Sequence, residues 1–263
     1  MLKLLGVPYD QNSSFKQGSA LAPERMRLMD IEGSSNRFCE HGIEIKPDKN
    51  YEDLGDILFH TDEPEAVYRQ IRQSIKDHLS LEDKIISIGG DHSISYPIIE
   101  AYSEIYNDLH VLHLDAHADI YENFKDNPYS HASPFARLLE KNVLKSLTQV
   151  GIRTLTIHQK SQIEKYKVKV VEMKDFNFDF LKSLKGPLYI SLDIDVLDPA
   201  FAPGISHHEP GGMTTRQLIN IINHIKVPIV GADIVEVNPK RDINDMTAMV
   251  AYKLFKELAS KMI

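Results

Sequence analysis

Three clusters of carboxylate and imidazole side chains stand out in this sequence because each directly follows a short apolar run. They are Gly89 to His92, the D-x-H-x-D segment Asp115 to Asp119, and Asp193 to Asp195. In an extended chain, side chains at alternate positions lie on one side, so the second cluster is predicted to direct three ligands to one place. Carboxylate and imidazole ligands without thiolates favour Mn²⁺ over structural Zn²⁺.

The charge of these clusters supports a metal site. Asp115, Asp119, Asp193 and Asp195 would bring four negative charges together. Carboxylates at close range cannot all stay ionised without a counter-charge, so either some take up protons or cations bind. Two divalent ions would balance the four charges. A single Asp-x-Asp after a strand is more often a turn or helix cap, but three such clusters at strand ends favour a metal centre.

The elements that must position these clusters alternate along the chain. Short runs rich in Ile, Val and Leu predict parallel strands at Leu2–Val7, Lys84–Ile88, His110–Asp115, Thr148–Gly151, Lys167–Val171, Pro187–Asp193 and Val227–Ile234. Apolar residues at three- and four-residue spacing predict helices at Pro64–His78, Tyr96–Ile105, Ser133–Lys141, Thr215–Ile225 and Asn244–Met262. This alternation predicts an α/β fold, with active residues at the carboxyl ends of the strands.

The domain organisation is predicted to be simple. No Ser- or Gly-rich linker, internal repeat or low-complexity tract divides residues 1–263, which favours one domain. The least regular stretches are Pro8–Ala22, Ala116–Ala132 and Val196–Gly212. Loops of that length in a compact domain are usually functional, and the last two directly follow predicted strands.

Composition narrows the classes of partner. The net charge of −8 argues against general nucleic-acid binding and suits a cationic small molecule or a metal ion. No apolar run approaches the ~18 residues of a membrane span, and the opening segment has too short an apolar run for a signal peptide. The single cysteine, Cys39, cannot form an internal disulfide. We therefore expect a soluble cytoplasmic protein without a membrane partner.

Longer motifs around the three clusters resemble the signatures of the ureohydrolase family, which includes arginases and agmatinases. The matching segments are Gly89-Gly-Asp-His-Ser-Ile-Ser95, Asp115-Ala-His-Ala-Asp-Ile-Tyr121 and the run from Ser191 to Gly204. Within the family, Tyr129–Arg137, Ala202–Gly212 and Gly231–Pro239 most resemble plant-type arginases. The resemblance covers nearly the whole chain. It implies an arginase-like three-layer αβα domain with a mostly parallel central sheet.

The resemblance also implies a binuclear manganese centre, with two Mn²⁺ ions in each subunit. The ligands it implies for the first ion are His92, Asp115, Asp119 and Asp193. Those for the second are Asp115, His117, Asp193 and Asp195, so that Asp115 and Asp193 would bridge. His131 matches the proton-transfer histidine and Glu236 the carboxylate that pairs with the substrate guanidinium. The family also leads us to expect a homo-oligomer, either a trimer or a hexamer.

The expected reaction is hydrolysis of a guanidino group by a metal-bridging hydroxide, with His131 passing a proton to the departing amine. L-arginine, giving ornithine and urea, is the first expectation. Agmatine, giving putrescine and urea, or another guanidino or amidino compound is the alternative. Arginine and agmatine differ by one carboxylate, which we expect to meet the loop Tyr121–Ser130, where Asn123 and Ser130 are candidate donors. A non-catalytic metal-binding relative that acts as a regulator is the alternative from another class.

Other histidines receive different expectations. His207 and His208 follow the third cluster closely and are candidates for the mouth of the pocket or for holding water. His113 lies inside an apolar run and is expected to be a hydrogen-bonded core residue. Asp91 and Asp198 are expected to fix the loops that carry the ligands.

Overall fold

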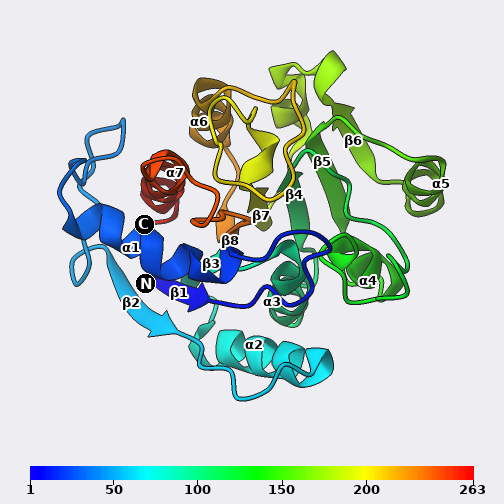
Figure 1. Cartoon of the computed structure of the whole chain (residues 1–263), viewed down its shortest axis with the longest axis horizontal. Helices are drawn as coiled ribbons and strands as arrows, with labels where there is room; N and C mark the ends of the chain where they lie inside the picture. Colours follow the sequence, from blue (N-terminus) through cyan, green and yellow to red (C-terminus); the bar gives the residue numbers. More distant parts are fainter.

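One eight-stranded sheet forms the centre of the computed structural model, which describes all residues from 1 to 263 (Figure 1). The strand order is β2-β1-β3-β8-β7-β4-β5-β6, and every neighbouring pair is parallel. The strands are β1 Leu2–Val7, β2 Tyr51–Asp56, β3 Lys84–Gly89, β4 His110–Leu114, β5 Ser146–Ile152, β6 Lys169–Glu172, β7 Leu188–Asp193 and β8 Ile229–Val235. The predicted parallel sheet is confirmed.

Helices cover both faces of the sheet. They are α1 Ala22–Ile31, α2 Pro64–His78, α3 Ser95–Ser103, α4 Pro134–Glu140, α5 Ile157–Tyr166, α6 Thr215–His224 and α7 Met246–Met262. One hydrophobic cluster joins α1, α6 and α7 to the sheet, and a second joins α2, α3 and α4 to its other face. This arrangement confirms the three-layer αβα fold. None of the helices is both long and apolar enough to cross a membrane.

The order of the strands explains where the site lies. After β3 the chain skips two places in the sheet before it forms β4, and β8 and β7 later fill the gap. Strands β3, β8, β7 and β4 are therefore contiguous, and their carboxyl ends share one edge. In open parallel sheets, binding crevices form outside the carboxyl ends where the strand order reverses. All three ligand clusters and Glu236 follow these four strands.

Among the strands and α-helices, three were not predicted from the sequence. Strand β2 lies at the edge of the sheet and has only one buried residue, Tyr51, so it lacks a continuous apolar run. Helix α5 buries only Gln159 and Gln162, both polar, which hides its helical period. Helix α1 begins at the end of the predicted irregular stretch Pro8–Ala22, with a proline in its first turn.

Candidate active site

The first group of ligand atoms surrounds His92, which begins a short 3₁₀ turn after β3. Its Nδ1 lies 3.1 Å from Oδ2 of Asp115, 3.1 Å from Oδ2 of Asp119 and 3.2 Å from Oδ2 of Asp193. The same Nδ1 atom is buried and has no hydrogen-bond partner. One nitrogen and three oxygens thus converge from the ends of β3, β4 and β7, in the manner of a coordination shell for one ion.

A second group lies beside the first and shares Asp115 with it. Nδ1 of His117 lies 3.0 Å from Oδ2 of Asp195 and 3.4 Å from Oδ1 of Asp115. Asp115 thus offers one oxygen to each group, as a bridging ligand must. Asp193 directs Oδ2 to the first group, while its Oδ1 accepts the backbone N–H of Asp195 at 2.8 Å. The paired groups fit a binuclear centre.

The ligand side chains of the segment from Asp115 to Asp119 come together for a different reason than predicted. Strand β4 ends at Leu114, and the cluster follows as a bend, so alternation in an extended chain was the wrong explanation. Oδ1 of Asp115 accepts the backbone N–H of His117 at 2.5 Å, which holds the bend. Asp119 then takes a left-handed backbone conformation with φ of 49°. The bend, together with this uncommon conformation, turns its carboxylate toward His92.

The charge of the site also fits divalent ions. Burial and the neighbouring carboxylates Asp195 and Asp115 raise the pKa of Asp193 well above its ordinary value. Burial and Asp115 raise the pKa of Asp195 to about 6. These shifts mean that the buried negative charge is incompletely compensated by protein groups. The donor set contains only carboxylate oxygens and imidazole nitrogens, which suits divalent ions such as Mn²⁺.

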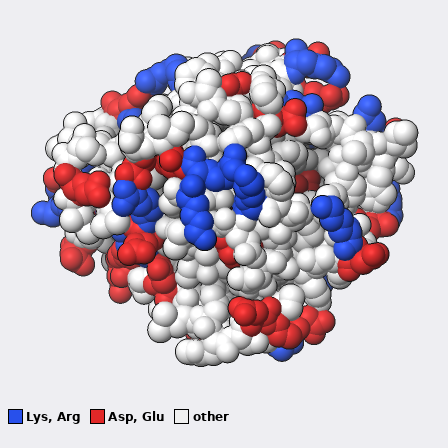
Figure 2. Space-filling view, in the orientation of Figure 1, with Lys and Arg blue, Asp and Glu red and all other residues white.

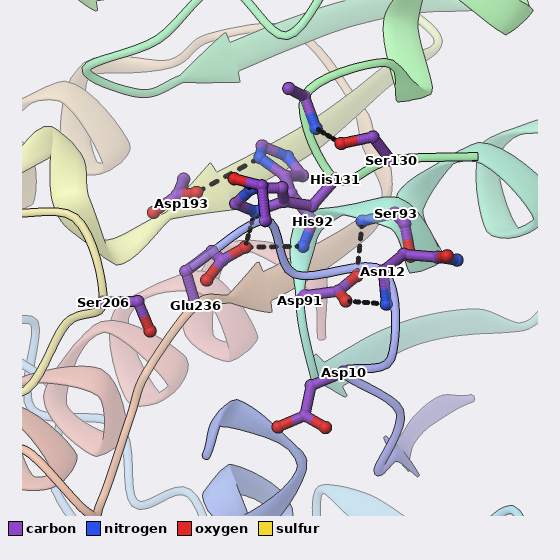
Figure 3. Close-up of polar contacts among 12 residues, drawn as sticks. Asp10, Asn12, Asp91, His92, Ser93, Ser130, His131, Asp193, Ser206 and Glu236 are labelled. Atoms are coloured by element: carbon purple, nitrogen blue, oxygen red, sulfur yellow. Dashed lines mark hydrogen bonds and ion pairs between the residues drawn. The ribbon is translucent and has the colours of Figure 1, made fainter. Parts of the chain in front are cut away.

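Glu236 and His131 form an ion pair beside the predicted metal ligands (Figure 3). Nδ1 of His131 lies 2.7 Å from Oε1 of Glu236, which also accepts the backbone N–H of His92 at 3.0 Å. Burial opposes a charge on His131, but Glu236 outweighs it and raises the pKa of His131 to about 9. The other oxygen of Glu236, Oε2, is buried without a partner. It is therefore free to accept from a bound cation.

A cavity of about 170 Å³ lies over these groups. The side chains that line it are Ser14, His117, Asp119, Tyr121, Phe124, His131, Ala132, Thr154, Gln159, Asp193, Asp195, His207 and Glu236. The predicted loop contributes Tyr121 and Phe124. Asn123 is exposed and Ser130 is buried, and neither lines the cavity, so their contact with a substrate stays a prediction.

The comparisons with known proteins agree on the family. The sequence pattern described as "Arginase family" matches residues 2–260. The chain belongs to the arginase family. Arginase 1, mitochondrial, of Arabidopsis thaliana is 44% identical over 275 residues, which cover 98% of this chain and 80% of the relative. The agmatinase of Bacillus cereus is 33% identical over 268 residues, covering 97% of this chain and 89% of the relative.

A solved structure of an arginase from Medicago truncatula superposes with a TM-score of 0.92 and 40% identity, covering 99% of this chain and 87% of that one. The predicted family and fold are therefore confirmed. Membership of the arginase family implies a binuclear metal centre and a small guanidino substrate, and the two groups of ligand atoms around Asp115 agree with the metal centre.

A buried hydrogen-bond chain orients His92 within this arginase-family site. Nε2 of His92 lies 3.0 Å from Oγ of Ser191, which donates to Oδ1 of Asp233 at 2.8 Å. Tyr189 donates to the other oxygen of Asp233 at 2.8 Å. Because the Ser191 hydroxyl hydrogen is given to Asp233, its oxygen accepts from Nε2–H. The Nδ1 lone pair of His92 is left to face the carboxylates.

His113 does more than the predicted core residue. It is buried and both ring nitrogens are bonded, as predicted, but its Nε2 lies 2.7 Å from Oδ2 of Asp115. Its Nδ1 accepts from Gln149 at 2.9 Å, and the same amide nitrogen contacts the carbonyl of Ala118 at 2.5 Å. Burial lowers the pKa of His113, so the neutral ring donates to Asp115 and orients it.

The structure tests only part of the remaining expectations, because a role in holding water stays a prediction for His207 and His208. His207 lines the cavity, with its ring centroid 5.2 Å from that of His131. His208 does not line it, because its Nε2 turns to the carbonyl of Pro203 at 2.9 Å. Asp91 and Asp198 accept backbone N–H groups and fix loops, as predicted.

Four residues near the site were not identified from the sequence: Ser14, Gln149, Ser191 and Asp233. One feature of the sequence pointed to Ser14, because it lies in the irregular stretch Pro8–Ala22. The other three lie within β5, β7 and β8, as polar side chains inside apolar runs. Ser191 and Asp233 also lie in segments that resemble the family, but no role was predicted for them.

Proposed function

We propose that this chain hydrolyses L-arginine to ornithine and urea with two Mn²⁺ ions. The residues that would hold the ions are His92, Asp115, His117, Asp119, Asp193 and Asp195, and Asp115 and Asp193 would be shared between them. One observation supports the proposal most directly: Glu236 lines the cavity together with members of both ligand groups, and its buried Oε2 has no partner. A buried carboxylate oxygen without a partner is costly unless a donor such as a guanidinium occupies it.

The metal ligands, Glu236 and His131 have different roles in the proposed reaction. When bound, a pair of divalent ions supplies a hydroxide nucleophile near neutral pH and stabilises the negative charge that develops during attack. Glu236 accepts hydrogen bonds from the planar guanidinium through Oε2, which fixes the position of the carbon. Its Oε1 is held by His92 and His131. His131 is protonated beside Glu236 and gives its proton to the departing amine.

Arginine is the first candidate substrate because plant relatives named arginase are 44% identical, against 33% for relatives named agmatinase. Agmatine remains the second candidate, because the residues that line the cavity include no Lys or Arg to pair with a carboxylate. A substrate carboxylate would then be held by neutral donors. Asn123 and Ser130 are our predicted donors, and Tyr121, Thr154 and Gln159 already lie in the lining.

Urea release from L-arginine and from agmatine, measured in parallel with metal-stripped protein reloaded with Mn²⁺, tests the proposal. Arginine should be preferred by roughly 5- to 150-fold for each buried donor that agmatine leaves unpaired, corresponding to about 1–3 kcal/mol. Asp195→Asn should abolish urea release from both. Urea mainly from agmatine would replace the substrate assignment. No urea from either substrate, with two Mn²⁺ bound, would indicate another guanidino or amidino substrate or a metal-binding regulator without turnover.

We further propose that residues 1–263 form one domain and that the chain assembles into a homotrimer or homohexamer. Size-exclusion chromatography with light scattering would measure the mass of the assembly. The proposed location is the cytoplasm, although the similar Arabidopsis relatives are named mitochondrial or chloroplastic. Fractionation of cells that make the protein would decide between these locations.

A further inference from the structure

The irregular stretch before α1 reaches the segment that carries His131. The backbone carbonyl of Asn12 accepts the N–H of His131 at 3.1 Å, and its side-chain oxygen accepts from Asn127 at 3.3 Å. The N–H of Asn12 is itself held by Asp91 at 3.0 Å, next to the ligand His92 (Figure 3). Residues far apart in the sequence thus fix the backbone beside the proton-transfer histidine.

Ser14, in the same stretch, contacts the imidazole ring itself. Its Oγ lies 2.9 Å from Nε2 of His131, while Nδ1 on the other side of the ring lies 2.7 Å from Glu236. Ser14 and His131 both line the cavity. Because both nitrogens have partners, rotation of the ring would break at least one hydrogen bond. Nε2 is the nitrogen left for exchange, since Nδ1 is committed to Glu236.

We propose that Ser14 is a positioning residue that holds His131 for proton transfer to the departing amine. The proposal rests on the proposed function. In the transfer, the Nε2–H bond of the imidazolium breaks, a new N–H bond forms on the amine, and the ring becomes neutral. A hydroxyl suits both states, because it accepts from Nε2–H before the transfer and donates to the Nε2 lone pair after it. Alanine offers neither bond, and threonine offers both.

The test compares Ser14→Ala and Ser14→Thr with Ser13→Ala as a matched control. Ser13 is the neighbouring serine, but its hydroxyl has no partner and it does not line the cavity. With Mn²⁺-loaded protein and L-arginine, Ser14→Ala should lower kcat by about 10-fold or more while KM changes less than about threefold. Ser14→Thr should recover kcat to within about threefold of wild type, and Ser13→Ala should match wild type.

A second readout does not depend on turnover. Exchange of the imidazole C2 proton, followed by mass spectrometry across a pH series, reports the titration of His131 in the Mn²⁺-loaded protein. Ser14 accepts from the charged ring, so Ser14→Ala should move the midpoint for His131 to lower pH, and Ser13→Ala should leave it in place. Unchanged kcat together with an unchanged midpoint in Ser14→Ala would overturn the proposal. If wild type released no urea, the proposed function would fail, but the exchange midpoint would still decide the Ser14 contact.

Discussion

Glu236 uses its two carboxylate oxygens differently. Oε1 accepts from His92 and His131, whereas Oε2 is buried and unpartnered. The residue also has a left-handed backbone conformation, with φ of 64°, directly after β8. Such a conformation is uncommon for a residue with a side chain and clusters at functional sites. The strain and the free oxygen agree with a carboxylate placed for a ligand.

Replacing Glu236 by Gln should therefore weaken the reaction while keeping the size of the side chain. The charge-assisted bonds to a guanidinium are lost, and each is worth about 1.5–3 kcal/mol, so kcat/KM should fall by roughly 10- to 100-fold or more. Steady-state urea release measures this. Glu40→Gln is the control, because it removes only ion pairs with Arg216 and Lys253 outside the site and should keep wild-type kcat/KM. Equal kcat/KM values for Glu236→Gln and wild type would remove Glu236 from the substrate site.

At the scale of single residues, the sequence predicted which side chains gather at the site but not which hydrogen bonds each of them makes. The three motifs and Glu236 come together because parallel strands end at one edge. Ser14 could not be predicted to contact His131, since they are 117 positions apart and lie in irregular segments. Asn123 and Ser130 were chosen by polarity alone, and loop polarity does not determine which side chains face a cavity.

At the scale of elements, the hydrogen bonds that orient the predicted ligand His92 depend on strands β3, β8 and β7 lying side by side. Asp233 in β8 bonds Ser191 in β7, and Ser191 contacts His92 at the end of β3. All three side chains are buried. The hydrogen-bond chain therefore exists only because β8 and β7 fill the gap between β3 and β4.

Asp233→Asn should weaken metal binding without removing a ligand. The amide cannot accept from both Ser191 and Tyr189 as the carboxylate does, so His92 loses its fixed orientation. Such outer contacts typically contribute 10- to 100-fold in metal affinity, and a drop in Mn²⁺ affinity in that range is expected by isothermal titration calorimetry.

The matched control for this variant is Ser87→Ala. Ser87 lies opposite Asp233 on β3, is buried and has no hydrogen-bond partner. Its removal should leave Mn²⁺ affinity unchanged. If Asp233→Asn bound Mn²⁺ as tightly as the Ser87→Ala control, the hydrogen-bond chain would have no part in holding His92.

Element boundaries show where sequence patterns are informative. Strand β1 and helix α2 match their predicted limits because each has a clear apolar pattern, such as Val67, Ile71 and Ile75 on the buried face of α2. Helix α7 begins at Met246, two residues after the predicted start, because Asn244 and Asp245 both have positive φ. Edge strand β2 has no such pattern, so only its pairing with β1 reveals it.

At the scale of the whole molecule, charge is distributed differently on the surface and in the interior. Figure 2 shows acidic and basic side chains interspersed on one face. The buried site instead gathers four carboxylates, Asp115, Asp119, Asp193 and Asp195, at the centre of the sheet edge. The energetic cost of this concentration should depend on both pH and metal ions.

Stability of the metal-free protein should therefore fall as pH rises. The pKa of Asp195 is raised to about 6 and that of Asp193 is raised well above its ordinary value, so the folded state binds more protons than the unfolded chain above about pH 4. Ion pairs with the carboxylates outweigh burial and raise the pKa of His92 and His117, which acts in the same direction. The stabilising protons are lost as pH rises through these folded-state values.

Mn²⁺ should reverse this trend. Its ligands must be deprotonated, so the increase in Tm on adding Mn²⁺ should be larger at about pH 8 than at about pH 6. Differential scanning calorimetry with and without a chelator measures both effects. An increase in Tm that is equal at the two pH values, or larger at the lower one, would show that these carboxylates do not bind the ion.

The most direct test of the account is to titrate Mn²⁺ into metal-free protein while urea release from L-arginine and bound metal are measured together. A binuclear centre predicts no urea without metal and a plateau of activity at two ions per chain. Full activity with one ion bound, or urea release by the metal-free protein, would contradict the assignment of the two ligand groups around Asp115 as one catalytic centre.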